Sequence, residues 1–344
     1  MKRLSTLVIV CLACYHLSAQ EASESYVYVS EAGTLYELLQ EEGLMDAEIL
    51  SVGGYLNGED IRILRSRMGG YFWLGIDEAE EGYPDRAFSL KHLNLEDAHI
   101  VEGGGPYVFM QDENPNNRDL WPHTANDVLG RQMFNLCFSL RSIILPKDIR
   151  RIEESCFQDC FITHLRIPES VTYIGEKAFT DCQNYPSGDY PMGDNCLQEL
   201  ILPDNQDLGI SSRAFCWCKK LSKVYCLSAQ PYQIKGSGNA IVFNQGILDK
   251  VELVVPKGSA MLYAAAPGWK EVSHITESED IVADATAKEM EWRLADEPSD
   301  ITLPSIRNAE RNVYSVSGMR LGNNVRGLNI VREADGSVRK VVVR

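Results

Sequence analysis

The chain has 344 residues, a formal net charge of −16 and 44% hydrophobic residues. Phosphate backbones would be repelled by such an acidic surface, so we expect no nucleic-acid partner. Within residues 1–19, Lys2 and Arg3 precede an apolar run and a small-residue cleavage site at Ala19, which is the pattern of a signal peptide. The apolar run is too short to be a permanent transmembrane segment. The chain is therefore predicted to be secreted or exposed on the cell surface.

Lipid attachment at Cys14 is the alternative to simple cleavage after Ala19. A lipoprotein signal would place an aliphatic residue where this chain has Cys11. The small-residue site at Ala19 is the better match, which favours cleavage there.

Residues 20–85 are predicted to form an α/β N-terminal cap. Residues 33–39 have helical spacing, with Thr34 placed as N-cap and Glu37 placed for a capping box. A second helix is predicted to begin at Asn57, with Asp60 three residues on. Its apolar side is formed by Ile61, Leu64 and Met68, and a first repeat-like strand lies at Ala47-x-x-Leu50-x-Val52. The two helices would cover the apolar end of the repeats that follow.

One pattern recurs within residues 86–275: apolar, two variable residues, apolar, one variable residue, apolar, usually followed by proline. Its copies are Leu140-x-x-Ile143-x-Leu145-Pro146, Ile162-x-x-Leu165-x-Ile167-Pro168 and Leu197-x-x-Leu200-x-Leu202-Pro203, with weaker ones at Leu90-x-x-Leu93-x-Leu95, Leu221-x-x-Val224-x-Cys226 and Leu248-x-x-Val251-x-Leu253. Residues alternate between the faces of a strand, so the last two apolar residues of each copy face the same way. A single copy cannot bury that face, whereas stacked copies can, which predicts a repeat solenoid.

Each copy continues with a second half that ends in Phe-x-x-Cys. It places Cys137, Cys160, Cys182 and Cys218 at the same point of successive coils. Equivalent positions in stacked coils predict a column of buried free thiols. Disulfide pairing stays open for the cysteines that break this register, namely Cys156, Cys196, Cys216 and Cys226. An insert of residues 183–195 lengthens one coil from the 22-residue spacing of Ile143 to Leu165 to the 35-residue spacing of Leu165 to Leu200.

The stretch from Ile162 to Cys182, which contains Ile-Pro-Glu-Ser-Val-Thr-Tyr-Ile-Gly-Glu-Lys-Ala-Phe-Thr-Asp-Cys, resembles the BspA-like leucine-rich repeat family of bacterial surface proteins. The resemblance extends over residues 30–275. It implies a β-rich leucine-rich repeat solenoid that binds an extracellular protein or glycan ligand, in adhesion for example.

Residues 276–310 are predicted to be an acidic linker, solvated and with one short helix around 285–294. Residues 311–344 are predicted to form a small β C-terminal tail of three strands. The three strands are Val313-Tyr-Ser-Val-Ser-Gly-Met-Arg-Leu321, Arg326-Gly-Leu-Asn-Ile-Val-Arg332 and Lys340-Val-Val-Val-Arg344. With this pattern the tail resembles the end of exported Bacteroidetes proteins that the type IX secretion system sorts, which implies contact with that secretion machinery. The alternative is that these strands only pack on the last coil.

Motifs for nucleophilic, metal-dependent or nucleotide-binding chemistry are absent from the sequence. We therefore predict no enzymatic activity, no catalytic residue, no metal site and no cofactor. The oxygen-rich loop of residues 111–119 does not match EF-hand spacing. Two alternatives to a binding protein remain: a structural envelope component, and a hydrolase with its site in the inserts, around His123 and the acids of residues 111–119.

The predicted binding face is the outward, concave side of the repeat strands. Its residues are Asn94, Ile144, His164, Arg166, Ile201, Tyr225 and Glu252. Arginine and aromatic side chains dominate most interfaces, so Arg166 and Tyr225 are the expected anchors. Ile144 and Ile201 would form an apolar floor between them, because solvent-facing positions need no hydrophobic residue. Ordinary sheet packing is the alternative explanation for these apolar residues.

Overall fold

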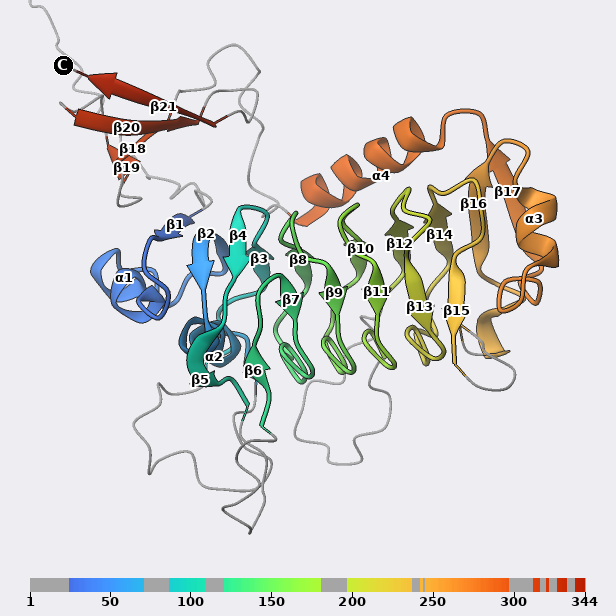
Figure 1. The fold of residues 1–344 in the computed structure, drawn as a ribbon, viewed down its shortest axis with the longest axis horizontal. Coiled ribbons are helices and arrows are strands. Elements are labelled where there is room, and N and C mark those ends of the chain that lie inside the picture. The colour runs from blue at the N-terminus through green and yellow to red at the C-terminus, as the bar shows by residue number, and fades with distance from the viewer. Residues whose placement is uncertain are drawn as a thin grey trace, which may run out of the picture.

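A computed structural model of the chain describes residues 25–70, 87–108, 121–180, 197–236, 242–243 and 245–296, together with short strands between 312 and 343. The repeats wind into a solenoid, in which two rows of parallel strands enclose an apolar core (Figure 1). The predicted signal peptide, the oxygen-rich loop of residues 111–119 and the insert of residues 183–195 lie outside the described residues.

The larger sheet is parallel and runs in the order β1-β2-β3-β8-β10-β12-β14-β16-β17, with β4 also paired to β2. Its strands are β1 (Ser25–Val29), β2 (Ile49–Leu56), β3 (His92–Asn94), β4 (Ala98–Ile100), β8 (Ser142–Ile144), β10 (His164–Arg166), β12 (Glu199–Leu202), β14 (Lys223–Cys226), β16 (Glu252–Pro256) and β17 (His274–Ser278). The register aligns the inward apolar residues Leu50, Leu93, Ile143, Leu165, Leu200, Val224 and Leu253. The solenoid predicted from the recurring pattern is thus present.

One copy of the pattern was assigned two residues out of register. Val224 pairs with Leu253, and Lys223 pairs with Glu252. The pattern of this coil therefore reads Leu253-x-Val255 rather than Val251-x-Leu253. A shift of two residues preserves the face, so Glu252 points outward as predicted.

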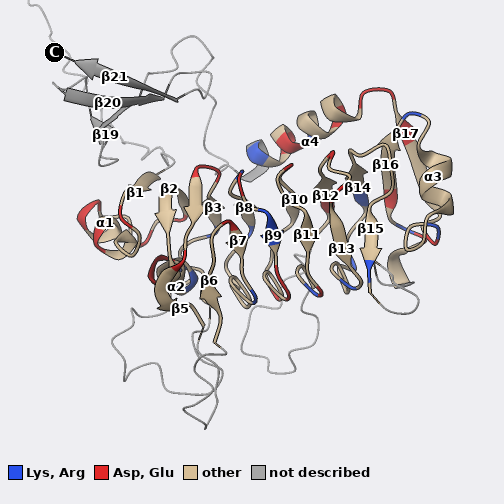
Figure 2. Ribbon diagram, in the orientation of Figure 1, with Lys and Arg blue, Asp and Glu red and all other residues tan. Residues whose placement is uncertain are grey.

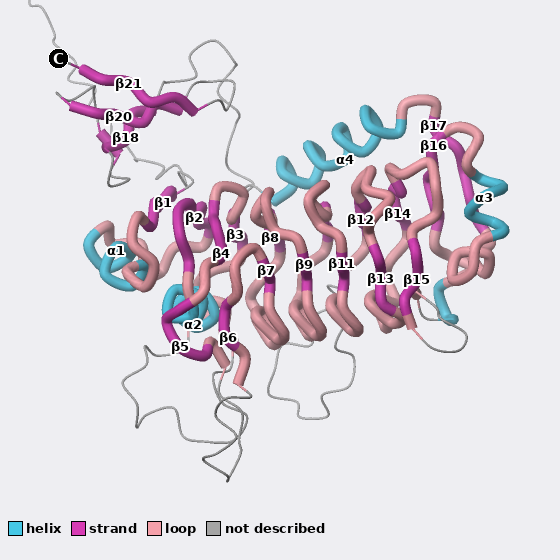
Figure 3. The backbone as a smooth tube through the Cα atoms, viewed as in Figure 1, coloured by secondary structure: helices cyan, strands magenta, loops and turns pink. Residues whose placement is uncertain are grey.

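The second sheet lies on the opposite side of the core. It contains β7 (Val128–Leu129), β9 (Arg151–Ile152), β11 (Tyr173–Ile174), β13 (Gly209–Ser211) and β15 (Gln233–Lys235), all parallel. A hairpin of β5 (Gly103–Pro106) and β6 (His123–Thr124) precedes it. From β8 to β15 each described coil consists of two short strands joined by loops and turns (Figure 3).

Stacked aromatic rings fill the core on the side of the turns. Phe134, Phe157, Phe179 and Phe215 form a ladder with centroid separations of 5.3, 5.2 and 5.2 Å and interplanar angles of 17°, 6° and 4°. The ladder continues through the tilted Phe243 to the edge of Trp269, which is fully buried. One ring per coil therefore packs on both neighbouring coils, which ties the stability of each coil to the next.

The predicted cysteine column is present at its three described positions. Cys137, Cys160 and Cys218 are buried and belong to no disulfide, and the Sγ of Cys160 donates to the carbonyl of Phe134 at 2.9 Å. Among the described residues, Cys156, Cys216 and Cys226 are also free and buried, so the open disulfide question is answered for these three. Cys182 and Cys196 lie outside the described residues.

The turns beside the ladder contain residues with positive φ, a backbone conformation that their residue types do not predict. Residues two before each phenylalanine have positive φ, namely Gln132, Ser155, Lys177 and Arg213, and so do Leu136, Asp159 and Trp217 two after it. None of these is glycine, so each turn is held in this region by the coil packing around it. Gly175 is required for another reason: a Cβ there would lie 2.5 Å from the backbone nitrogen of Glu154 in the preceding coil.

Helix α2 (Gly58–Arg67) begins as predicted. Asn57 is its N-cap and accepts from the amide of Glu59, and Asp60 completes a capping box. Its apolar side, formed by Ile61, Leu64 and Met68, is fully buried. The start of this helix was readable from sequence because the cap lies within one turn.

Helix α1 (Leu35–Glu41) has Thr34 at its N-cap position as predicted, but the predicted capping by its side chain is wrong. Thr34 makes no capping hydrogen bond, and its hydroxyl donates to the carbonyl of Glu31 instead. The amides of Gly33 and Leu35 donate to the carboxylate of Asp60 at 2.6 and 3.0 Å. Burial raises the pKa of Asp60, although three backbone amides oppose that shift. A carboxylate from α2 thus performs the capping expected of Thr34 and Glu37.

The segment predicted to be a solvated acidic linker is structured at its start. After η3 (Gln245–Ile247), β16 and α3 (Ala260–Ala265), the chain adds β17 to the large sheet and then forms α4 (Ile281–Asp296). Helix α4 runs back along the sheet across β16, β14, β12 and β10 (Figure 1). It is a packed element, because its buried side chains contact the strands beneath it.

The C-terminal region contains a four-stranded antiparallel sheet among the residues described. Its strands are β18 (Asn312–Ser315), β19 (Arg320–Leu321), β20 (Gly327–Arg332) and β21 (Val338–Val343). The first of the three predicted strands is in fact two, since Val313 pairs with Leu321 in a hairpin. Within the described ranges, no helix is long and apolar enough to cross a membrane.

Candidate binding face and its covering helix

Two rows of side chains cross the outward face of the large sheet. The register aligns His92, Ser142, His164, Glu199, Lys223 and Glu252 in the first row, and Asn94, Ile144, Arg166, Ile201, Tyr225 and Val254 in the second. All seven predicted site residues therefore lie on one face. Val254 also belongs to the second row, but the predicted set does not include it because the pattern of this coil was placed two residues too early. Strand pairing produces these rows because equivalent residues of neighbouring coils lie side by side.

Helix α4 covers the second row between β12 and β16. Ile201, Tyr225, Leu227 and Val254 from the sheet side form one buried cluster with Ile281, Ala285 and Trp292 of the helix. Ile201 is fully buried and Tyr225 is 7% exposed. The expectation that both side chains face solvent is therefore wrong. These apolar residues of the outward face pack against α4, a helix of the same chain.

Charged groups attach the C-terminal half of α4. Arg166 donates to the carboxylate of Glu289 at 3.1 Å. Trp292 donates its indole N–H to Glu199 at 2.7 Å and stacks on the ring of His164, with centroids 5.1 Å apart. These contacts are half-buried, so salt screens them less than fully exposed pairs. Arg166 and His164 thus hold the helix in this structure.

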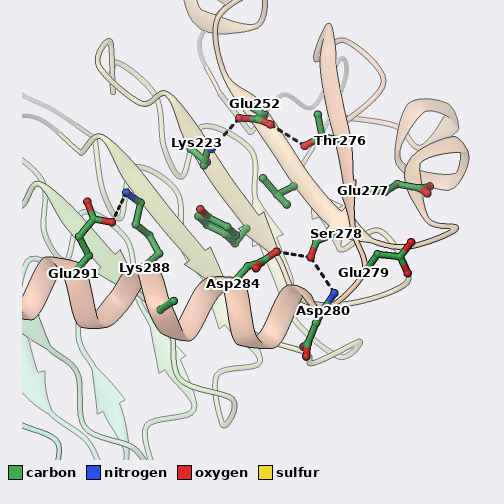
Figure 4. A pocket seen from close by; sticks show the side chains of 13 residues that line it. Lys223, Glu252, Thr276, Glu277, Ser278, Glu279, Asp280, Asp284, Lys288 and Glu291 are labelled. Carbon is green, nitrogen blue, oxygen red and sulfur yellow. Dashed lines mark hydrogen bonds and ion pairs between the residues drawn. The ribbon is translucent and has the colours of Figure 1, made fainter.

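The first part of the helix encloses an open groove against β14, β16 and β17. Its cavity volume is about 750 Å³. Figure 4 shows Lys223, Glu252 and Thr276 on the strand side, and Asp284 and Lys288 on the helix side. Tyr225, Val254 and Ala287 line it with ring and aliphatic atoms.

Hydrogen bonds order the polar walls of this groove. Lys223 pairs with Glu252 at 3.0 Å, and Thr276 donates to the same carboxylate at 2.8 Å. The hydrogen bond to Glu252 raises the pKa of Lys223. Burial pushes the pKa of Glu252 upward, but the hydrogen bonds from Thr276 and Lys223 outweigh it and lower that pKa overall. At neutral pH both partners are charged.

The beginning of α4 is fixed within the same groove. Ser278 donates to Asp284 at 2.5 Å and accepts from the amide of Asp280 at 3.2 Å. The carboxylate of Asp280 accepts from the amide of Ala283 at 3.1 Å, which satisfies one of the open donors at the helix start. Figure 2 shows acidic residues in the link between β17 and α4 and on the helix itself.

Asn94, Ile144 and Glu252 complete the predicted set. Asn94 and Ile144 are half-buried on β3 and β8, and the side chain of Asn94 accepts from the amide of Glu96 at 3.0 Å. Glu252 lies at the other end of the sheet, in the groove. In the described part of the chain, no three His, Cys, Asp or Glu side chains are grouped so that they could hold a metal ion.

Sequence reasoning missed α4 as part of this face. The available signal was the spacing of Ile281, Ala285 and Trp292, which puts one apolar side chain on the same side of most turns. Many charged residues surround these three, so the helix reads as solvated when the sheet beneath it is not considered.

Comparison with known proteins identifies the repeats. A family model described as "BspA type Leucine rich repeat region" matches residues 105–195 in six copies. A search of curated proteins finds no match. Among solved structures, a leucine rich cell surface protein from Faecalibacterium prausnitzii A2-165 is similar at 15% sequence identity and a TM-score of 0.20, over 75% of this chain and 85% of that chain. At this TM-score the structural similarity carries no argument.

Proposed function

We propose that this chain, whose repeats belong to the BspA-type leucine-rich repeat family, is a binding protein that recognises an extracellular protein or glycan. The recognition surface is the outward face of the large sheet together with the edge of α4. Adhesion of the cell that exports the protein is the role that this family resemblance favours. The observation that carries the proposal is the pair of in-register rows on that face.

The face has the properties of a binding surface. Apolar members of the second row lie beside the polar first row, and together they already hold a helix through Ile281, Ala285 and Trp292. A sheet face that binds a helix by apolar anchors with charged flanks uses the same contacts as protein–protein interfaces. Ile144 continues the row on β8 and is half-buried rather than covered.

The groove supports binding better than hydrolysis. Acid catalysis needs a carboxyl group whose pKa is raised toward neutrality. The pKa of Glu252 is shifted in the opposite direction by Thr276 and Lys223. The ion pair with Lys223 thus keeps this groove carboxylate charged and hydrogen-bonded.

Export belongs to the same proposal. Residues 1–19 act as a cleaved signal peptide, and intact-mass measurement of the exported protein should show Gln20 as the first residue. Residues 311–344 act as a sorting region that contacts the secretion machinery. Deleting residues 313–344 should then leave the protein in the periplasm with an unchanged melting temperature, and normal surface display would contradict the sorting role.

An array of extracellular-matrix proteins and glycans, probed with the protein lacking residues 1–19, tests the binding function. Ile144→Lys should reduce capture at least tenfold, because a charge replaces an apolar contact near the centre of the face. Met261→Lys is the matched control, since Met261 is 86% exposed on α3, outside the two rows. Equal capture by both variants, or no capture of any array component by the unmodified protein, would reject the proposal.

A further inference from the structure

The groove beneath the first turns of α4 carries a net negative charge. Its lining includes the carboxylates of Glu252, Glu277, Glu279, Asp280, Asp284 and Glu291, and the ammonium groups of Lys223 and Lys288. Six negative and two positive charges give a formal charge of −4. Both lysines are already paired, Lys223 with Glu252 and Lys288 with Glu291. The two lysines of the groove therefore do not cancel its negative charge, and the groove attracts a cationic group that enters it.

The hydroxyl of a largely buried tyrosine that lines the groove adds a separate observation. Tyr225 is 7% exposed and lines the groove, yet no described residue forms a hydrogen bond with its hydroxyl. Burial raises the pKa of this phenol, so it stays protonated and can both donate and accept. Because Tyr225 lines the groove and its hydroxyl has no partner among the described residues, this hydroxyl is available to a bound group.

The shape and chemistry of the groove suit a long basic side chain. Val254 and Ala287 supply aliphatic surface for a hydrocarbon stem, while Asp284 and Glu252 lie on opposite walls for its charged head (Figure 4). Lysine and arginine combine such a stem with such a head. A neutral sugar would need an exposed aromatic face for stacking, whereas the ring of Tyr225 is buried in the cluster beneath α4.

We propose that this groove binds a lysine- or arginine-bearing segment of a partner protein. The inference rests on the proposed binding function and names both the site and the chemistry of the partner. The side chain lies over Val254 and Ala287, its cation faces Asp284, and the hydroxyl of Tyr225 contacts the segment. Acidic partners are excluded by the charge of the groove.

Fluorescence anisotropy with a labelled oligo-arginine peptide tests this directly, with the folded protein that begins at Gln20. Binding should saturate and weaken with added salt. The double variant Asp284→Asn, Glu252→Gln should weaken binding at least about tenfold, since each change removes a charge-assisted contact while keeping the side-chain shape. Tyr225→Phe should weaken it by about threefold or more through loss of the hydroxyl alone.

A charge-matched control separates the groove from the general acidity of the chain. Glu41→Gln, Asp46→Asn removes two exposed carboxylates near α1 and should leave the affinity unchanged. Equal losses in the two double variants would show nonspecific attraction and overturn the proposal. Binding of neutral oligosaccharides that Tyr225→Phe abolishes, with oligo-arginine binding intact, would make the groove a glycan site instead. Array capture that depends on Ile144 but not on Asp284 and Glu252 would preserve the binding function and reject only the groove.

Discussion

Trp292→Ala is expected to release the C-terminal half of α4 from the sheet. Trp292 is 7% exposed, and Ile281 and Ala285 are the other apolar anchors of the helix in the cluster that it shares with the sheet. An aromatic side chain buries roughly 200 Å², and at about 25 cal/mol per Å² this corresponds to about 5 kcal/mol. The regained rotamer freedom and the retained Cβ reduce the net loss to about 3–5 kcal/mol.

Hydrogen–deuterium exchange of the α4 amides measures this release. A loss of about 3 kcal/mol accelerates exchange from the helix on the order of a hundredfold, while the strands of the repeats keep their protection. Met290→Ala is the control, since Met290 lies on the same helix and is 60% exposed. Unchanged exchange in Trp292→Ala, or equal acceleration in both variants, would refute the assignment of Trp292 as the anchor.

Three further predictions concern the repeats and the groove. Phe179→Ala should destabilise the array by about 3–5 kcal/mol in chemical denaturation, because it opens a cavity in the ring ladder; a loss below about 1 kcal/mol would contradict that packing. Cys160 should resist thiol reagents until the array unfolds, because burial raises its pKa well above the ordinary value, and rapid labelling of this residue in the native protein would be the contrary result. For the Lys223–Glu252 pair, the lowered pKa of Glu252 gives stability that is present above about pH 4.3 and lost as the pH falls through the folded-state pKa. The raised pKa of Lys223 gives stability that is present below about pH 10.4 and lost as the pH rises through its folded-state pKa. The difference in melting temperature between the unmodified protein and Lys223→Met should therefore be constant from about pH 5 to 9 and shrink below about pH 4, with at most about 1 kcal/mol involved; a constant difference down to pH 2 would disprove this.

The repeat pattern predicted the solenoid because each coil contains the same local arrangement of buried apolar residues. Inward residues such as Leu165 and Leu200 recur at strand spacing, and their parity alone fixes which face is buried. The capping box of Asn57 and Asp60 was also local and readable. In contrast, Lys177 and Trp217 have positive φ although neither residue type favours it, because the stacking of whole coils imposes their conformation.

The sequence predicted which residues lie on the outward face of the large sheet, but it did not predict that a helix covers some of them. Ile201 and Tyr225 were recognised as apolar residues on an outward face, and this departure from polarity was the signal of a covering element. Identifying that element requires matching two segments about sixty residues or more apart. The acidic surroundings of Trp292 obscured this match, because charge composition describes the exposed side of a helix and not its buried stripe.

Hydrogen–deuterium exchange of the complex with the partner captured on the array tests the recognition surface most directly. Binding at the proposed face should increase protection in β8, β14 and β16 and in α4, with little change in β9 and β11 on the opposite sheet. Protection confined to β9 and β11, or to the region before β3, with α4 and β14 unaffected, would contradict recognition by the outward face of the large sheet.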